Sequence, residues 1–430
     1  MNIWSATQED MDGAVLQAKI VNETDWFNIG GLNEVINWYN GVGLPGNPGG
    51  SYNVGSYGWT GIDTAWKEVR HKLDELAGKE NVRLRVSFGS DNSGNTDGFA
   101  FDDIWLGERS RQVIVESFTN SGSAGSASVN PDFNTLMAQK ATDAIDIQYH
   151  TSFPDFDELN DQNPSDPSAR STYYGITDVP WAIVNGNIMH TSTTQVINNH
   201  QKLDEQALLD PLFQIELETI KTENQIEVIA DIKSMQELTN YELTAQVLIT
   251  ENEITEITGE NGETEFLSVL RKMLPNAGGT NLPQNWNAGQ TEQISFSWQF
   301  ENVYDPEKIN AVVFIQDETT QEIYQGTSDD SASSQNGIAH NLISMKEEDG
   351  FIIYPNPASA EIMILLKNQL QSTGTMNIYN TTGKIIDQKL IEPGVYKFPM
   401  RVGHIKSGLY VIQLIENQKI IDTRRFIKLE

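Results

Sequence analysis

The chain has 430 residues, contains no cysteine, and carries 60 acidic against 28 basic residues, which gives a formal net charge of −32 at pH 7. A surface of this sign repels phosphate backbones and anionic membranes, and the absence of thiols excludes disulfides, thiolate metal sites and cysteine nucleophiles. The length favours about three or four domains over a single hydrophobic core.

The start of the chain, Met1–Ala6, lacks the basic region and apolar core of a signal peptide. No apolar run in the sequence reaches the roughly 18 residues that a membrane-spanning helix needs. An exported protein needs a signal peptide. We therefore expect the chain to be a fragment, or its start to have been trimmed.

Residues 1–110 are rich in Gly, Asn, Trp and Tyr, and Val82–Phe88 alternates polar and apolar residues as a strand does. The segment Asp97–Leu106, together with Asp12–Gln17 and Ile36–Tyr39, resembles the later part of a jelly-roll module of the MAM or laminin-G kind. The resemblance implies a jelly-roll sandwich whose first strands are missing. Such modules bind a glycan or protein ligand, or only space other domains.

The acidic pair Asp102 and Asp103 lies on a predicted strand of this module. Alternation predicts that one carboxylate points inward, where it needs a cation, an arginine or backbone donors. Related jelly rolls place Ca²⁺ at this corner, so a Ca²⁺ site at Asp102 or Asp103 is one expectation. A hydrogen-bonded structural aspartate is the other.

Residues 111–205 predict an α/β domain. Arg111–Thr119 is a strand, and the small residues that follow it lead into a helix with Ser128 or Asn130 as its cap. Ala144–His150 is a second strand, and a turn, a third strand and a hairpin come after it. Strand, helix, strand and then a proline before a third strand is the thioredoxin order.

Residues 111–330 resemble the thioredoxin-like proteins of the outer membrane protein Omp28 family. The positions that carry the resemblance are Tyr149, His150, Arg170, Tyr174, Gly175, Ile176, Pro180, Asn185 and Gly186. In that family a Cys-x-x-Cys motif follows the first strand, and the matching positions here are Ser123 and Ser126. The resemblance implies that the Val179–Pro180 peptide bond is cis and faces these two serines.

The two serines decide the chemistry that we expect. Thiol–disulfide exchange needs a thiolate and a second sulfur, and a hydroxyl supplies neither at neutral pH. The helix N-terminus can still hold an anion, a carboxylate or a peptide backbone, or the domain is only a scaffold. Acyl transfer by Ser123 with His150 as its base is a further alternative, but the sequence lacks a Gly-x-Ser-x-Gly elbow. A hydrogen-bonded strand-end histidine is the simpler interpretation of His150.

Residues 206–327 predict an Ig-like β-sandwich, because Phe213–Ile220, Gln225–Ile232 and Tyr241–Ile249 alternate polar and apolar residues. The Omp28 family supplies such a module after its thioredoxin-like domain. Residues 328–348 are a polar linker. The sequence contains no P-loop, no His-Glu-x-x-His motif and no pair of histidines at helical metal-ligand spacing.

Residues 349–430 combine strand-like apolar runs with proline-rich and glycine-containing turns, which predicts a small Ig-like β-sandwich. Its ordered motif positions are Tyr354, Pro355, Asn356, Pro357, Gly383, Gly408, Tyr410 and Lys428. Their order resembles the C-terminal sorting domain of the Por, or type IX, secretion system. The resemblance implies that this tail contacts the secretion machinery, carries the chain across an outer membrane and is often removed there. An Ig-like module without a sorting role is the alternative.

The sequence thus predicts a mainly β, multidomain protein: a jelly-roll sandwich, a thioredoxin-like α/β domain, an Ig-like β-sandwich and a small C-terminal Ig-like β-sandwich. We expect a secreted or outer-membrane surface protein that binds or scaffolds, is not an enzyme, and has no nucleic-acid partner and no transmembrane span. Ca²⁺ is its only candidate cofactor. The alternatives are a relative of thiol–disulfide oxidoreductases and the accessory region of a larger secreted hydrolase.

Overall fold

The computed structural model describes residues 1–20, 25–50, 57–329 and, in the last part of the chain, 351–428 apart from 355–357, 367–369, 371, 381–383, 396 and 418. The chain divides into two compact units, Met1–Ile338 and Ala339–Glu430. Most of the predicted linker, residues 328–348, lies outside the described residues.

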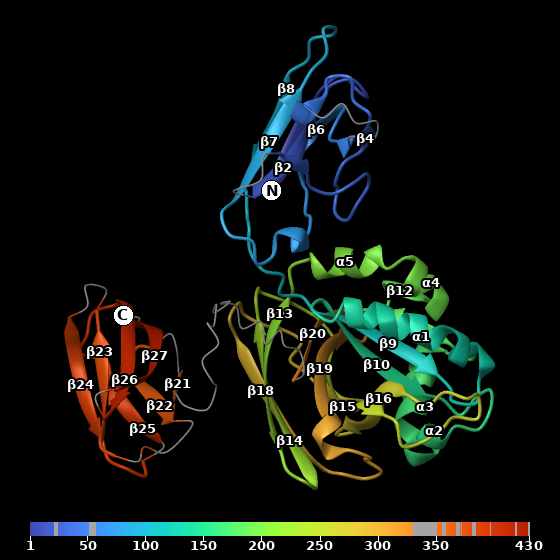
Figure 1. The fold of residues 1–430 in the computed structure, drawn as a ribbon. Helices are drawn as coiled ribbons and strands as arrows, with labels where there is room; N and C mark the ends of the chain where they lie inside the picture. The colour runs from blue at the N-terminus through green and yellow to red at the C-terminus, as the bar shows by residue number, and fades with distance from the viewer. Residues whose placement is uncertain are drawn as a thin grey trace. The chain divides into compact units, whose positions relative to one another are not determined.

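Residues 1–110 form small antiparallel sheets, with the strand orders β6-β1-β8, β3-β2-β7 and β4-β5 (Figure 1). The strands are β1 (Asn2–Ala6), β2 (Gly13–Ile20), β3 (Phe27–Asn28), β4 (Gly41–Val42), β5 (Tyr57–Gly58), β6 (Ile62–Glu68), β7 (Val82–Gly89) and β8 (Gly98–Asp102). Trp38, Tyr39 and Trp59 form the aromatic centre of the core, with the Trp38 and Trp59 rings 4.8 Å apart in an edge-to-face contact. The strand predicted at Val82–Phe88 is confirmed as β7. The jelly-roll assignment stays a prediction.

The next part of the chain is an α/β layer. Its elements are β9 (Val113–Thr119), α1 (Ala124–Gln139), β10 (Ala144–His150), α2 (Glu158–Gln162), α3 (Ser165–Tyr174), β11 (Trp181–Val184), β12 (Met189–Ser192), α4 (Thr193–Asn198) and α5 (Gln201–Ala207). Strands β9 and β10 are parallel, β11 is antiparallel to β9, and β12 is antiparallel to β11. This order, β12-β11-β9-β10, supports a thioredoxin-like domain, which remains our proposal.

Side-chain alternation along β9 explains how helices cover both faces of this sheet. Val113 and Val115 pack with α1, α4 and α5 on one face, whereas Ile114 and Phe118 pack with the α3 side on the other. Helix α1 begins at Ala124 with Ser123 as its cap, and not at the later position predicted from Ser128 or Asn130. The small residues before Pro131 therefore form the first turns of the helix instead of a loop.

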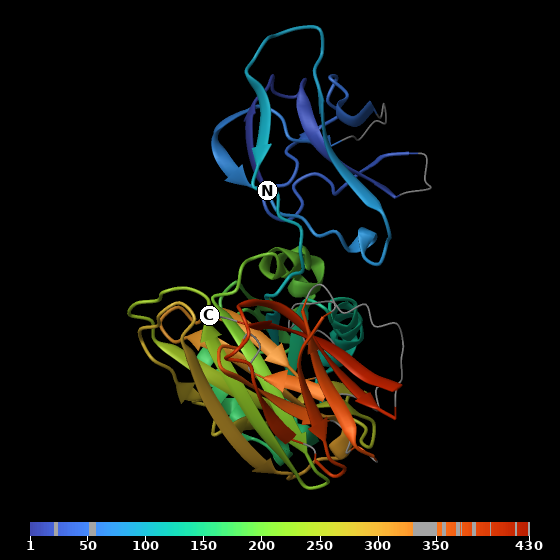
Figure 2. The same cartoon turned by 90° about the vertical axis from the view of Figure 1, so that its left-hand side faces the viewer.

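The following strands build a β-sandwich: β13 (Phe213–Lys221), β14 (Gln225–Ser234), β15 (Leu243–Ile254), β16 (Phe266–Leu274), β17 (Thr280–Asn281), β18 (Thr291–Gln299), β19 (Ile309–Asp317) and β20 (Ile323–Ser328). The sheet β13-β14-β18 packs over one face of β15 and β19 through a shared core (Figure 2). This arrangement agrees with the expected β-sandwich of residues 206–327.

The sandwich and the α/β layer are not separate sheets. Strand β16 pairs in parallel with β10 at Gln148 and Val269, which joins both parts into one nine-stranded sheet. One hydrophobic cluster also contains residues from both sides, such as Phe118 and Leu270. The α/β layer and the sandwich thus each have a hydrophobic cluster of their own and share a third one across their junction.

The second unit is a sandwich of a three-stranded and a four-stranded antiparallel sheet, β21-β22-β25 and β24-β23-β26-β27. The strands are β21 (Phe351–Tyr354), β22 (Glu361–Leu366), β23 (Gly374–Tyr379), β24 (Ile385–Ile391), β25 (Lys397–Arg401), β26 (Gly408–Glu416) and β27 (Lys419–Lys428). The unit has its own hydrophobic core. Near the start of β26, the Tyr410 hydroxyl donates to the Lys406 carbonyl oxygen at 2.8 Å, a back-bond typical of Ig-like sandwiches.

The predicted sorting positions fall at the ends of these strands where they are described. Tyr354 ends β21, Gly408 begins β26, and Lys428 ends β27 with a buried side chain. The backbone of Lys428 also forms a parallel bridge with Ala358. Pro355, Asn356, Pro357 and Gly383 lie outside the described residues.

Candidate functional site

The turn between β9 and α1 brings Ser123 and Ser126 together. Ser123 Oγ accepts a hydrogen bond from the Ser126 backbone N–H at 3.3 Å, and Ser126 Oγ accepts one from the Asn120 N–H at 3.3 Å. Ser126 is fully buried and Ser123 is 6% exposed. Both hydroxyl oxygens thus serve as acceptors for the backbone of the turn that they belong to.

Pro180 lies against the same turn. The Val179–Pro180 peptide bond is cis, as predicted. A Cβ atom added to Gly125, between the two serines, would lie 3.4 Å from Pro180 Cδ. The structure therefore gathers Ser123, Ser126 and Pro180 at the start of α1.

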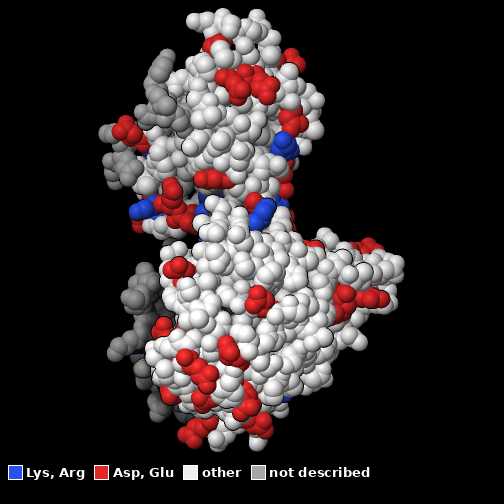
Figure 3. Space-filling view, turned by 90° about the vertical axis from the view of Figure 1, so that its right-hand side faces the viewer, with Lys and Arg blue, Asp and Glu red and all other residues white. Residues whose placement is uncertain are grey.

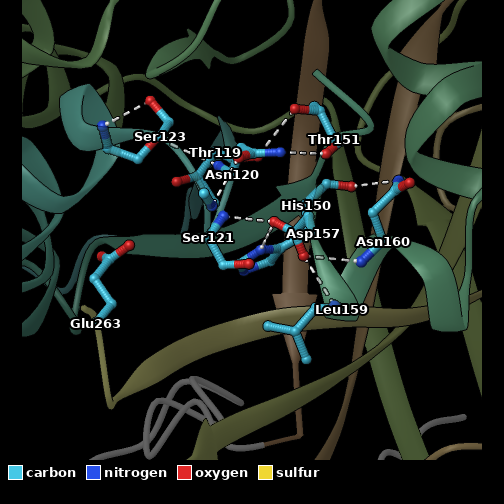
Figure 4. Close-up of polar contacts among 12 residues, drawn as sticks. Thr119, Asn120, Ser121, Ser123, His150, Thr151, Asp157, Leu159, Asn160 and Glu263 are labelled. Carbon is cyan, nitrogen blue, oxygen red and sulfur yellow. Dashed lines mark hydrogen bonds and ion pairs between the residues drawn. The ribbon is translucent and has the colours of Figure 1, made fainter. Parts of the chain in front are cut away.

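His150, considered above as a base for Ser123, has a different partner. His150 Nδ1 lies 2.8 Å from Asp157 Oδ2, and both side chains are buried (Figure 4). The same Asp157 oxygen accepts from the Ser121 backbone N–H at 2.6 Å. Because the described hydrogen bonds of Ser123 do not include His150, the geometry gives no nucleophile–base pair.

Asp157 was not identified from the sequence, although an aspartate just before a short helix is a recognisable capping signal. Its Oδ1 accepts from the backbone N–H groups of Leu159 and Asn160 at 2.8 and 3.0 Å, which caps α2. Burial alone would raise the pKa of this carboxyl, but His150 and the backbone donors outweigh burial and lower that pKa. Asp157 is therefore a charged carboxylate that ties three elements together.

His150 Nε2 is buried and has no hydrogen-bond partner among the described residues. The imidazole ring meets the Phe266 ring edge-on, with the centroids 5.6 Å apart. Since Nδ1 faces the Asp157 carboxylate, we assign a hydrogen to Nδ1, which donates to Oδ2. The strand-end histidine is thus hydrogen-bonded on one side and packed against β16 on the other.

Asp102 and Asp103, the candidate Ca²⁺ ligands, are both exposed. Strand β8 ends at Asp102, and Asp103 has a positive φ of 49°, so strand alternation does not continue through the pair. The expectation of one inward carboxylate was therefore wrong. Asp103 Oδ2 accepts from Asn2 Nδ2 at 2.9 Å, and the part of the chain that the structure describes contains no cluster of three or more acidic or histidine side chains suited to a metal ion.

A cavity of about 690 Å³ opens at the N-terminal module. Apolar side chains from the sheets β3-β2-β7 and β6-β1-β8, among them Leu16, Leu84 and Phe101, line it together with residues 207–210 at the end of α5. Phe101 is 44% exposed, and Trp105, just beyond β8, is 72% exposed. Exposed apolar side chains around a cavity of this size are typical of a recognition surface.

Two family models match the chain. Residues 352–429 match the secretion system C-terminal sorting domain, and residues 167–330 match outer membrane protein Omp28. Among curated proteins, none matches this chain. Together the two matches indicate a type IX cargo that is secreted or held at the outer-membrane surface.

Solved structures show weaker likeness. HBP35 of Porphyromonas gingivalis is 12% identical, with 76% of this chain and 100% of that chain covered and a TM-score of 0.41. The two fibronectin type III domains of chicken tenascin are 8% identical, with 51% and 98% covered and a TM-score of 0.15. These scores support no conclusion about function. No helix within the described ranges is long and apolar enough to cross a membrane.

Proposed function

We propose that this type IX cargo acts outside the cell as a binding or scaffold protein, and that its thioredoxin-like domain performs no thiol–disulfide exchange. The observation that carries the proposal is the pair Ser123 and Ser126 at the start of α1, next to Pro180. Exchange needs a thiolate that attacks and a second sulfur that resolves the mixed disulfide. Two hydroxyl groups that already accept backbone hydrogen bonds can do neither.

Insulin reduction by dithiothreitol tests this proposal. The purified chain should leave the rate at the uncatalysed background, while thioredoxin in the same buffer accelerates it. Turnover above background that depends on the chain concentration would contradict the proposal. This assay also addresses the alternative of a thiol–disulfide oxidoreductase.

The N-terminal module is our candidate for the recognition surface. The cavity beside Leu84 and Phe101 and the exposed ring of Trp105 support this part of the proposal. The large negative charge of the chain, visible as scattered acidic side chains in Figure 3, argues against an anionic partner. We therefore propose an uncharged glycan or a protein ligand.

Neutral oligosaccharides titrated against the tryptophan fluorescence of the full chain test the glycan ligand. Binding should quench or shift the emission in the native chain, and Trp105→Ala should weaken binding at least tenfold. Trp66→Ala is a matched control, because Trp66 is also exposed but does not line this cavity. Equal weakening in both variants would contradict the assignment of the site.

A further inference from the structure

The loop that joins β15 to β16, residues 255–265, reaches the turn that carries Ser123. The Asn261 backbone N–H donates to the Ser121 carbonyl oxygen at 2.9 Å. The Asn261 side chain continues the contact, since its Nδ2 donates to the Ser123 carbonyl oxygen at 3.0 Å. A loop of the β-sandwich is thus fixed to the start of α1.

Glu263 extends this attachment to Asn130, about two turns further along α1. Its Oε1 accepts from Asn130 Nδ2 at 2.8 Å, and its Oε2 accepts from Asn261 Nδ2. Figure 4 shows the Glu263 side chain beside the turn of Ser121 and Ser123. The loop therefore places a carboxylate against the side of the first two turns of α1.

Hydrogen bonds within the loop also fix its conformation. The Gly262 N–H donates to the Gly259 carbonyl oxygen at 2.9 Å, and the Glu263 N–H donates to Asn261 Oδ1 at 3.0 Å. A Cβ atom on Gly259 would lie 2.6 Å from the Ser121 carbonyl oxygen, so a larger residue cannot approach this closely. The contact with the α1 turn is tight as well as polar.

Neighbouring residues at the start of α1 differ in their exposure to solvent. Ser123 is 6% exposed, whereas Ala124, the next residue along the chain, is exposed. We propose that residues 255–265 act as a built-in cover on the side of the α1 turn that holds Ser123, so that position 123 is closed to outside reagents while Ala124 and Gly125 stay exposed. The inference rests on the proposed non-redox role of this domain and names the residues, Asn261 and Glu263, that close it.

A group that approaches Ser123 from the side of this loop would have to displace the Asn261 contacts, and a negatively charged group would also be repelled by Glu263. Loosening the loop should therefore expose position 123 without changing the rest of the helix end.

Thiol labelling tests the cover directly, because the chain has no cysteine and a single introduced one is unique. The rate of reaction with a small aromatic disulfide reagent is measured for Ser123→Cys and for Ala124→Cys in the full chain. Both thiols stand at the N-terminus of α1, so the helix dipole acts on both. We expect Ser123→Cys to react at least tenfold more slowly than Ala124→Cys.

Asn261→Asp then loosens the loop, since it places a second carboxylate against Glu263. Added to Ser123→Cys, it should raise the labelling rate at least tenfold, and added to Ala124→Cys it should change nothing. Glu263→Gln should act in the same direction, more weakly. Asn276→Asp is the matched control, because Oδ1 of this exposed loop asparagine likewise accepts from a backbone N–H, that of Gly278, within its own loop.

Equal labelling of Ser123→Cys and Ala124→Cys would overturn the inference, and so would a Ser123→Cys rate that neither Asn261→Asp nor Glu263→Gln changes. Melting curves of each variant confirm that faster labelling comes from a folded chain. These labelling results do not decide the proposed non-redox role, which fails if the native chain itself accelerates insulin reduction.

Discussion

Arg170 on α3 and Glu116 on β9 form a two-pronged ion pair in the interior of the first unit. Arg170 Nε lies 2.9 Å from Glu116 Oε1, and Nη2 lies 2.7 Å from Oε2. Tyr149 and Tyr174 donate to the same carboxylate, and burial raises the pKa of both phenols well above its usual value, so they stay neutral donors. Gln316 of β19 accepts from Arg170 at 3.1 Å, which links the α/β layer to the sandwich.

Arg170→Leu should therefore destabilise the first unit strongly. It leaves the Glu116 carboxylate buried without its cation, which costs about 3–5 kcal/mol of unfolding free energy. Chemical denaturation measures the loss. Arg83→Leu, at an exposed position on β7, is the control and should change stability by less than about 0.5 kcal/mol. A similar small effect of Arg170→Leu would show that the pair contributes little.

The carboxyl group of Asp146 on β10 should make the stability of the first unit depend on pH. Burial raises the pKa of its carboxyl to about 7, and Oδ1 is buried without a partner among the described residues. Because the folded pKa lies above the unfolded one, this group favours folding fully below about pH 4 and loses that contribution as pH rises through 7. Asp146→Asn should stabilise the folded chain at pH 8 by about 1–2 kcal/mol, which is measured as a higher melting temperature, and have little effect at pH 4.

The exposed Asp132 on α1 provides the comparison for Asp146. Asp132→Asn should leave the pH profile of the melting temperature as it is in the native chain. If the melting temperatures of Asp146→Asn and of the native chain change with pH in the same way from pH 4 to pH 8, the carboxyl group of Asp146 has no effect on the pH dependence of stability.

Asp157→Asn tests the pair with His150. The amide keeps the cap of α2 but loses the charge that His150 and the Ser121 N–H stabilise, which should cost about 1–3 kcal/mol. Since the folded pKa of Asp157 is lowered, its contribution is present above the ordinary aspartate pKa of about 4 and is lost as pH falls below it. The difference between variant and native chain, followed by denaturant titration, should therefore shrink toward pH 2. A difference that grows toward acid would contradict this account.

Local patterns predicted the strands well, because residues such as those of β7 and β14 alternate polar and apolar side chains along one strand. The tail sandwich was predictable for the same reason. The parallel junction between β10 and β16 was not, since the pairing of Gln148 with Val269 joins strands about 120 residues apart and leaves no local signal.

The candidate site was predictable only in part. Ser123, Ser126 and Pro180 follow from the order of the elements, but the loop with Asn261 and Glu263 comes from a different module and has no sequence signal for this contact. Asp102 and Asp103 were misplaced because strand β8 ends between them. The start of α1 was placed too late because Ser, Gly and Ala before Pro131 have the composition of a flexible loop.

The most direct test of the central claim, that this is a type IX cargo, is the export of a reporter by its tail. Residues 339–430 form a compact unit with a core of their own, so they can be fused behind a periplasmic reporter with a signal peptide. In a host with the type IX machinery, cell fractionation should find the reporter at the surface or in the medium, and in a host without that machinery it should stay periplasmic. A reporter that remains periplasmic in both hosts would contradict the account.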